Sequence, residues 1–194
     1  MVTLQHRHPV AVIGRGNVGP ETDAYQTAEL LGEELGKRDL LIICGGGLGV
    51  MEAVCRGCAK AGGIAIGVLP ELAGQGNSAA TIVIPADLGN AGNPRNAGDK
   101  PCGKGETSRN RVVVGGSLCV FAVAGERGTA NELRIAKELR KRVFGLCKPP
   151  EPECHNGASY WNAPGSGFTT HADVPDALDK CRQYLSTKIP NLRW

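Results

Sequence analysis

Short apolar runs alternate with amphipathic segments along most of the chain. The apolar runs show no alternation of apolar and polar residues, which is typical of strands that are buried on both faces. They predict strands at residues 10–13, 40–44, 64–69, 81–84, 118–123 and 143–147. Between them, apolar residues recur at spacings of three and four, as at Ala24, Ala28, Leu31 and Leu35, which is the period of a helix. Helices are predicted at residues 21–37, 48–62, 108–115, 129–141 and 173–185, with Pro20 in the first turn of the first one and Asp173 as the cap of the last.

Two stretches lack this periodicity. Residues 86–105 are rich in Gly, Asn and Pro and predict a long loop. Residues 148–166 are irregular apart from a candidate edge strand at Tyr160-Trp161.

The alternation of strands and helices predicts the fold class. We expect a single α/β domain over residues 1–194, with a doubly wound, mostly parallel, Rossmann-like sheet between two layers of helices. In such sheets ligands bind at the carboxyl ends of the strands, where the strand order reverses. Glycine-rich segments follow three of the predicted strands, at residues 14–19, 45–49 and 125–128. Their backbone N–H groups predict a site for phosphate or another oxyanion.

Charge and hydropathy narrow the class of partner. The formal net charge is +3, which lacks the basic excess of nucleic-acid-binding proteins, so no nucleic acid is expected. The longest apolar run, at residues 40–44, is too short to span a membrane, and the N-terminus lacks the apolar core of a signal peptide. These features predict a cytoplasmic protein without a membrane partner.

The chain contains eight cysteines. Six of them fall in predicted strands and helices and are expected to be small core residues with free thiols. Cys55 and Cys58 have the CxxC spacing of a metal or redox motif, but both lie on the apolar stripe of a predicted helix and no second CxxC exists. We therefore expect no metal site.

The first glycine segment, Gly14-Arg15-Gly16-Asn17-Val18-Gly19, has the GxGxxG spacing of a dinucleotide fingerprint. That fingerprint also requires an acidic residue at the end of the next strand, whereas Asp39 precedes that strand. The segment therefore favours phosphate contact, through Gly14, Gly16 and Asn17, over NAD binding. A purely structural turn is the alternative.

The second glycine segment leads directly into a predicted helix. Its glycines would let the helix N-terminus approach an anion with no side chain between them, and tight packing of the helix on the strand is the alternative. The candidate ligand residues here are Gly45, Gly46, Gly47, Gly49 and Met51.

The third segment, Gly125-Glu126-Arg127-Gly128-Thr129-Ala130-Asn131-Glu132, also joins a strand to a helix. Its candidate phosphate ligands are Gly125, Arg127, Gly128 and Thr129. Thr129 and Glu132 also have the spacing of a capping box, in which the glutamate serves only to cap the helix.

In combination, these segments resemble a known protein family. The run from Cys44 to Ala53, continuing through 62–70, resembles the glycine-rich segment of the molybdenum-cofactor carrier protein family. That family shares a Rossmann-like superfamily with the LOG (LONELY GUY) phosphoribohydrolases. Ser108-Arg109-Asn110 is similar to the Arg-Asn pair that opens a helix in the carriers, and residues 125–132 are similar to the PGGxGTxxE motif of the superfamily.

The resemblance implies roles for two side chains. In LOG enzymes an arginine and the final glutamate of the motif carry catalysis, and Arg109 and Glu132 match those positions. This chain departs from the motif, because it has Ala124 for the proline and Glu126 for the second glycine, and the HxRK segment of LOG enzymes is absent. The departures favour the carrier side of the superfamily.

Two functions follow from the sequence. In the first, the protein binds a phosphorylated small molecule, such as the molybdenum cofactor as cargo or a nucleotide, and performs no chemistry on it. In the second, it hydrolyses the N-glycosidic bond of a nucleoside 5′-monophosphate, with Arg109 and Glu132 as catalytic residues. Neither function requires a bound cofactor for chemistry. The relatives form dimers or larger assemblies, so a homo-oligomer is expected.

Overall fold

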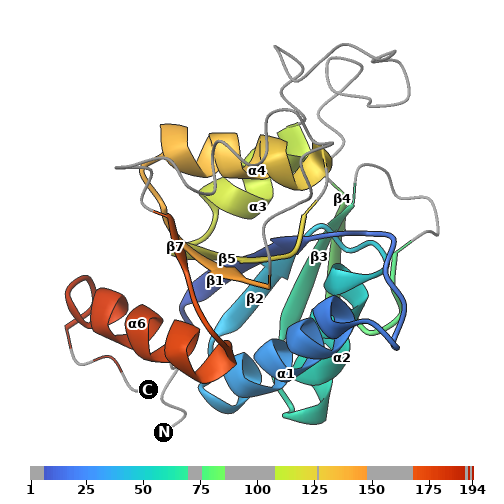
Figure 1. Ribbon diagram of the computed structural model, residues 1–194, viewed down its shortest axis with the longest axis horizontal. Helices are drawn as coiled ribbons and strands as arrows, with labels where there is room; N and C mark the ends of the chain where they lie inside the picture. The colour runs from blue at the N-terminus through green and yellow to red at the C-terminus, as the bar shows by residue number, and fades with distance from the viewer. Residues whose placement is uncertain are drawn as a thin grey trace, which may run out of the picture.

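A computed structural model describes residues 7–69, 76–85, 108–125, 127–147, 168–190, 192 and 194. Within these residues seven strands form one sheet in the order β4-β3-β2-β1-β5-β6-β7, and every neighbouring pair is parallel (Figure 1). The strands are β1 (Pro9–Gly14), β2 (Leu41–Cys44), β3 (Ala65–Leu69), β4 (Ile82–Pro85), β5 (Cys119–Val123), β6 (Arg142–Leu146) and β7 (Phe168–Thr170). The predicted parallel α/β sheet is confirmed.

The strand order reverses between β1 and β5. From β1 the chain adds β2, β3 and β4 on one side, and it then returns to place β5, β6 and β7 on the other. The register pairs Gly14, the last residue of β1, with Val123, the last residue of β5. The carboxyl ends of these two strands therefore form the point at which ligands bind in doubly wound sheets.

Helices cover both faces of the sheet. Three of them, α1 (Asp23–Lys37), α2 (Val50–Lys60) and α6 (Val174–Ser186), lie on one face, and α3 (Ser108–Gly115) and α4 (Arg127–Glu138) lie on the other (Figure 1). Each face has its own apolar core, one around Phe121 and Phe144 and the other around Ile13, Leu133 and Ile135. The three predicted layers are confirmed.

Helices α1 and α2 pack through glycines. A Cβ atom at Gly32 would lie 2.1 Å from the carbonyl oxygen of Val54, and a Cβ at Gly57 would lie 1.9 Å from that of Glu29. Because neither contact leaves room for a side chain, the two backbones touch. These glycines lower the helix propensity of α1 and α2, but they permit the two helices to approach each other closely.

The helix ends follow local hydrogen bonds. Thr22 caps α1, since its hydroxyl accepts a 3.3 Å hydrogen bond from the Tyr25 N–H. The helix therefore begins at Asp23, and Pro20 lies before the first turn and not in it. Asp173 caps α6 as predicted, by accepting from the Asp176 N–H at 2.9 Å.

The cysteines in the described ranges are free thiols. Five are buried and Cys147 is half-buried, whereas Cys102 and Cys154 lie outside those ranges. The described residues contain no group of His, Cys, Asp and Glu that could hold a metal ion. The described helices include none with the length and apolarity needed to cross a membrane. The predicted edge strand at 160–161 and the predicted loop at 86–105 also lie outside the described residues.

Candidate functional site

The first glycine segment begins at the point where the strand order reverses. A Cβ atom at Gly14 would lie 2.3 Å from the carbonyl oxygen of Val123 and 2.6 Å from Cγ1 of Val50. Gly14 therefore permits β1, β5 and the start of α2 to meet. This contact is a structural reason for the glycine that requires no ligand.

The first and second glycine segments pack against each other. Gly49 has a φ of +66°, and a Cβ there would lie 2.5 Å from the carbonyl oxygen of Arg15. The same oxygen accepts a 3.0 Å hydrogen bond from the N–H of Val50, the first residue of α2. Because the protein itself satisfies that N–H and Glu52 adds negative charge to the first turn, the start of α2 is a weaker anion site than its glycines alone predict. Anion contact by this segment stays a prediction.

Asn77 fixes the second glycine segment from a distance. Its side-chain Nδ2 donates to the carbonyl oxygen of Gly47 at 2.9 Å, and its backbone N–H donates to that of Gly46 at 2.8 Å. Gly46 has a φ of +69°, and its Cα lies 2.9 Å from the position of a Cβ at Gly67 on β3. Asn77 acts across 30 positions of sequence, and no local pattern marks it.

Arg109 holds the carboxyl ends of β2 and β3. From the first turn of α3, its Nε donates to the carbonyl oxygen of Val68 at 2.9 Å and its Nη2 donates to that of Gly45 at 2.7 Å. A Cβ at Gly45 would lie 1.9 Å from Nη2, so Gly45 makes room for the guanidinium. The Nη2 atom also lies 3.8 Å from Sδ of Met51. The structure therefore brings Arg109, Gly45 and Met51 together.

Glu132 lies on α4 and is buried. Burial raises the pKa of its carboxyl to about 7, although the nearby positive charge of Arg109 acts to lower it. A carboxyl with a pKa near neutrality can both donate and accept a proton at physiological pH. The charge of Arg109 thus acts on the carboxyl of Glu132, as expected if the two side chains belong to one site.

Thr129 also lies within α4 and not at its cap. The helix begins at Arg127, so the capping-box alternative for Thr129 and Glu132 is wrong. Thr129 is 2% exposed, and its hydroxyl has no hydrogen-bond partner among the residues that the structure describes. A buried hydroxyl without a partner carries a desolvation cost, and a ligand that hydrogen-bonds to it would remove that cost.

A hydrogen bond links the two helices that carry these residues. Nδ2 of Asn110 on α3 donates to Oδ1 of Asn131 on α4 at 3.0 Å. Asn110 follows Arg109 and Asn131 precedes Glu132, so this bond fixes the start of α3 relative to α4.

The remaining predicted ligand residues differ in their surroundings. Gly16, Asn17 and Gly128 are exposed, and Gly125 is buried behind the end of β5. The Arg127 side chain and Glu126 lie outside the description.

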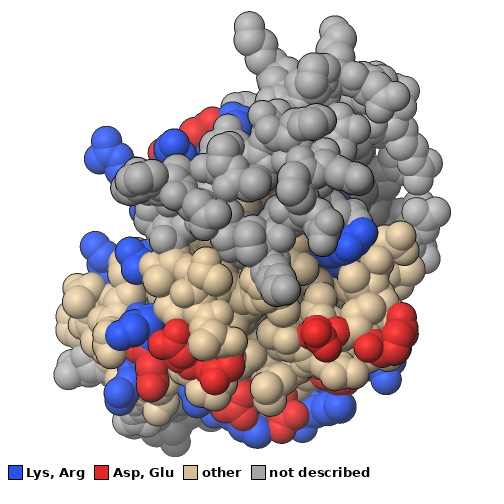
Figure 2. Space-filling model, in the orientation of Figure 1, with Lys and Arg blue, Asp and Glu red and all other residues tan. Residues whose placement is uncertain are grey.

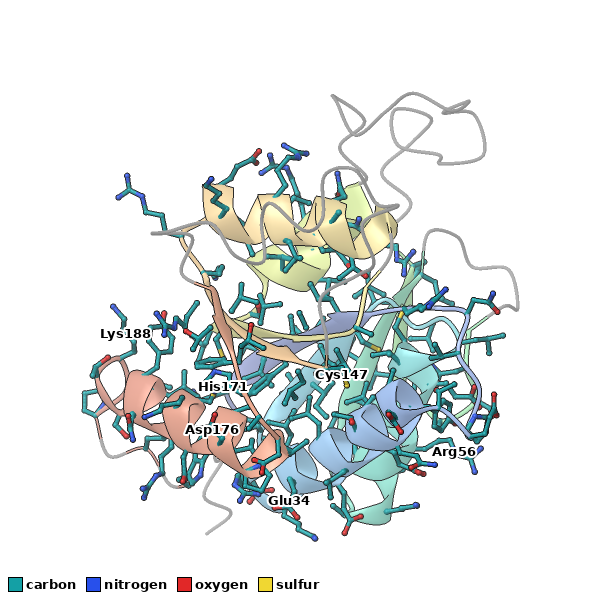
Figure 3. All side chains as sticks on the ribbon, viewed as in Figure 1. Glu34, Arg56, Cys147, His171, Asp176 and Lys188 are labelled. Atoms are coloured by element: carbon teal, nitrogen blue, oxygen red, sulfur yellow. The ribbon has the colours of Figure 1, made fainter. Side chains whose placement is uncertain are left out.

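One pair of titratable groups lies away from the switch point. His171 follows β7, and its Nδ1 lies 2.8 Å from Oδ2 of Asp176 at the start of α6 (Figure 3). The imidazole lowers the pKa of the Asp176 carboxyl. The His171 ring packs 5.7 Å from the ring of Phe144, so the pair joins the end of β7 to α6.

Comparisons with known proteins agree with this description. The model of the SLOG cluster4 family matches residues 7–98. The molybdenum cofactor carrier protein of Chlamydomonas reinhardtii has 26% sequence identity with this chain and covers 93% of it, with 99% of that structure matched and a TM-score of 0.71. The molybdenum cofactor binding protein of Rippkaea orientalis has the same fold, with a TM-score of 0.73, 23% identity, and 93% of this chain and 98% of that one covered.

A sequence relative matches most of the chain. An uncharacterized protein of Archaeoglobus fulgidus is 34% identical over 141 residues, which are 73% of this chain and 80% of that protein. The matching family model and the carrier structure of Chlamydomonas reinhardtii confirm the resemblance to the LOG-like superfamily that contains the molybdenum cofactor carriers. The chain belongs to one family with this archaeal protein, and its residues 7–98 match the SLOG cluster4 model, within the LOG-like superfamily.

Proposed function

We propose that this protein binds and carries a phosphorylated small molecule of the molybdenum cofactor class, and that it holds the phosphate at the start of α4. The similarity to the carrier protein of Chlamydomonas reinhardtii over nearly the whole length of both chains supports the carrier role. The unpartnered, buried hydroxyl of Thr129 is the observation that supports the position of the phosphate.

The starts of the two helices at the switch point differ in electrostatics. The first turn of α2 contains Glu52, and the first N–H of that helix already bonds to Arg15. The first turn of α4, which begins at Arg127, contains no acidic residue and includes the buried Thr129 hydroxyl, although Glu126 directly precedes the helix in the sequence. Since helix N-termini attract anions, the start of α4 is the better phosphate site.

The engagement of Arg109 favours carrying over hydrolysis. If the protein were a hydrolase, the Arg109 side chain would position the substrate. However, Nε and Nη2 of Arg109 already donate hydrogen bonds to two carbonyl oxygens of the protein. Moving the guanidinium toward a substrate would leave both carbonyl groups without these bonds, each of which is worth about 1.5–3 kcal/mol. Arg109 therefore serves to hold the site in shape.

One observation favours the alternative function, a nucleoside 5′-monophosphate phosphoribohydrolase. Glu132 has a pKa of about 7, which suits a general acid or base at neutral pH. Hydrolysis of AMP, followed by chromatography of released adenine, distinguishes the two functions. We expect tight binding of the molybdenum cofactor without release of base from AMP.

The Thr129→Val variant tests the position of the phosphate. Valine has the shape of threonine without the hydroxyl, and because that hydroxyl has no partner within the described part of the chain, the variant should fold with undiminished stability. We expect the affinity for the molybdenum cofactor, measured by calorimetry, to fall about tenfold or more, since a hydrogen bond to a charged group is worth about 1.5–3 kcal/mol. Thr129→Ser, which keeps the hydroxyl, should retain most of the affinity.

Two results would contradict the proposal. Equal affinities of native protein and Thr129→Val would place the phosphate elsewhere. Rapid release of adenine from AMP that disappears in Glu132→Gln would show that the protein is a hydrolase.

A further inference from the structure

The outer surface of the α3–α4 layer is basic. Its exposed and partly exposed charged side chains are the basic Arg111, Arg134, Lys137, Arg140 and Lys141 and the acidic Glu138. Figure 2 shows basic groups around one acidic group at the upper left of the molecule, over the end of α4. The whole-chain net charge of +3 conceals this clustering, because the acidic residues of α1 offset it. We call these six residues, with Val112, Gly115, Gly116 and Leu139, the α3–α4 face.

Contacts between the two helices hold this face rigid. Oε2 of Glu138 on α4 binds Nη2 of Arg111 on α3 at 3.0 Å, and Oε1 of Glu138 binds Arg134 one turn before it. The ammonium group of Lys141 donates to the carbonyl oxygen of Gly115 at 3.3 Å and to that of Ser117, at the end of α3. These contacts fix Arg111, Arg134 and Lys141 in place before any partner binds.

The centre of the face is apolar. Val112 and Leu139 are each 39% exposed, and Gly115 and Gly116 between them are exposed as well. Leu139 lies against Gly115, since its Cδ1 would be 3.7 Å from a Cβ there. Two aliphatic side chains and two glycines thus contribute exposed apolar area to the face that carries the basic groups.

We propose that the α3–α4 face is a docking surface for an acidic protein surface with an apolar centre. An apolar centre with arginine enriched around it is the usual composition of a protein–protein interface, and the positive charge requires a partner of opposite sign. Single-stranded nucleic acid fits less well, because such sites stack bases on aromatic side chains and neither α3 nor α4 contains an aromatic residue.

The position of the face connects docking with the candidate site. Helix α4 begins at that site and continues into the face, and Arg134 follows Thr129 by five residues, which is roughly 7.5 Å along the axis. Arg109 and Arg111 lie on the same helix α3. A partner on the α3–α4 face would therefore lie beside the carboxyl ends of β1 and β5, where a small molecule would leave or enter. The inference goes beyond the proposed function and does not depend on which small molecule is bound.

Binding of a labelled acidic peptide by the full chain tests this inference. The probe is a short peptide of Asp and Glu with interspersed Leu, and fluorescence anisotropy at about 0.15 M ionic strength measures its dissociation constant. In the double variant Lys137→Glu, Arg140→Asp we expect the affinity to fall about tenfold or more, because two attractive charges become repulsive. Aspartate suits position 140, where φ is +53°.

Two further variants make the test specific. Lys180→Glu, Arg182→Asp on α6 changes the net charge equally but lies on the other face of the sheet, and should leave peptide affinity within about twofold of native. Leu139→Ser removes apolar area from the centre without changing charge and should weaken binding of the peptide several-fold.

Three results would overturn the proposal. The first is the absence of peptide binding to native protein, and the second is an equal loss in the α3–α4 and α6 variants, which would show an effect of net charge alone. The third is a higher affinity for a single-stranded DNA oligonucleotide or for phosphatidylserine vesicles than for the peptide, if that affinity is lost in the Lys137→Glu, Arg140→Asp variant. None of these measurements involves Thr129, so failure here is distinguishable from failure of the proposed carrier function.

Discussion

Replacing Glu132 by glutamine should stabilise the protein at alkaline pH. Burial raises the pKa of this carboxyl from the ordinary value of 4.5 to about 7, and the opposing effect of Arg109 is smaller. A carboxyl with a raised pKa opposes folding when it is ionised, because the unfolded chain binds its proton less tightly than the folded protein does. The cost is absent well below pH 4.5, grows as the pH rises, and is complete above pH 7. Glutamine has a similar shape and stays neutral, so the variant avoids this cost.

The magnitude follows from the two pKa values. A difference of about 2.5 units corresponds to about 3 kcal/mol at full ionisation. The variant should therefore exceed the native protein in free energy of unfolding by about 3 kcal/mol at pH 8 and by about 1 kcal/mol at pH 5. At roughly 2–4 °C per kcal/mol for a chain of this size, the gain in melting temperature should be about 4–8 °C larger at pH 8 than at pH 5.

Urea unfolding followed by circular dichroism at both pH values measures the effect. Comparison of variant with native protein at each pH cancels the titration of all other groups. Glu138→Gln is the matched control, because Glu138 lies on the same helix but is 40% exposed and forms ion pairs with Arg111 and Arg134; its neutralisation should not raise stability at either pH. A difference between Glu132→Gln and native protein that is the same at pH 5 and pH 8 would refute the argument from burial.

Three further predictions follow from the packing of the site and from the cysteines. Gly49→Ala should lower the free energy of unfolding by more than about 2 kcal/mol, because φ is +66° and a Cβ would lie 2.5 Å from the carbonyl oxygen of Arg15. Gly62→Ala should lower it by only about 1 kcal/mol, because Gly62 has a φ of +68° but open space around it. Equal losses of stability in urea titrations of the two variants would contradict this difference. Arg109→Met should cost about 2–4 kcal/mol because Val68 and Gly45 lose their donors, and denaturation without a measurable change would show that these bonds are dispensable. Chelator and reductant should leave the melting temperature unchanged because the described cysteines are free thiols, and stoichiometric zinc in purified protein would contradict this expectation.

The fold could be predicted because its signals are local. Runs such as residues 10–13 and 118–123 show buried parallel strands directly, and the spacing of apolar residues in 24–35 shows a helix. Leu48 shows the limit of such patterns, since it fits the stripe of the second helix but is 60% exposed in the glycine turn before that helix. The contact of α1 with α2 through Gly32 and Gly57 was also missed, because a glycine inside a helix indicates low propensity and does not identify its neighbour.

The site was only partly predictable for a related reason. Resemblance indicated that Arg109 and Glu132 are important, but not that Arg109 bonds to the carbonyl groups of Val68 and Gly45. Asn77 gave no signal, because its role depends on contacts 30 residues away. Interactions between segments distant in sequence become visible only when strand order and register are known.

Once the structure is known, the glycine-rich segments are weaker evidence for a ligand than they are in the sequence alone. Gly14 makes room for β5 and α2, Gly45 makes room for Arg109, and Gly49 makes room for Arg15, so the fold requires these glycines whether or not an anion binds. A buried hydroxyl without a partner is different, because it has a cost that the folded protein does not offset. Thr129 has this property at a helix start that faces the switch point. This residue, rather than the glycine count, is the stronger reason to place the phosphate at α4.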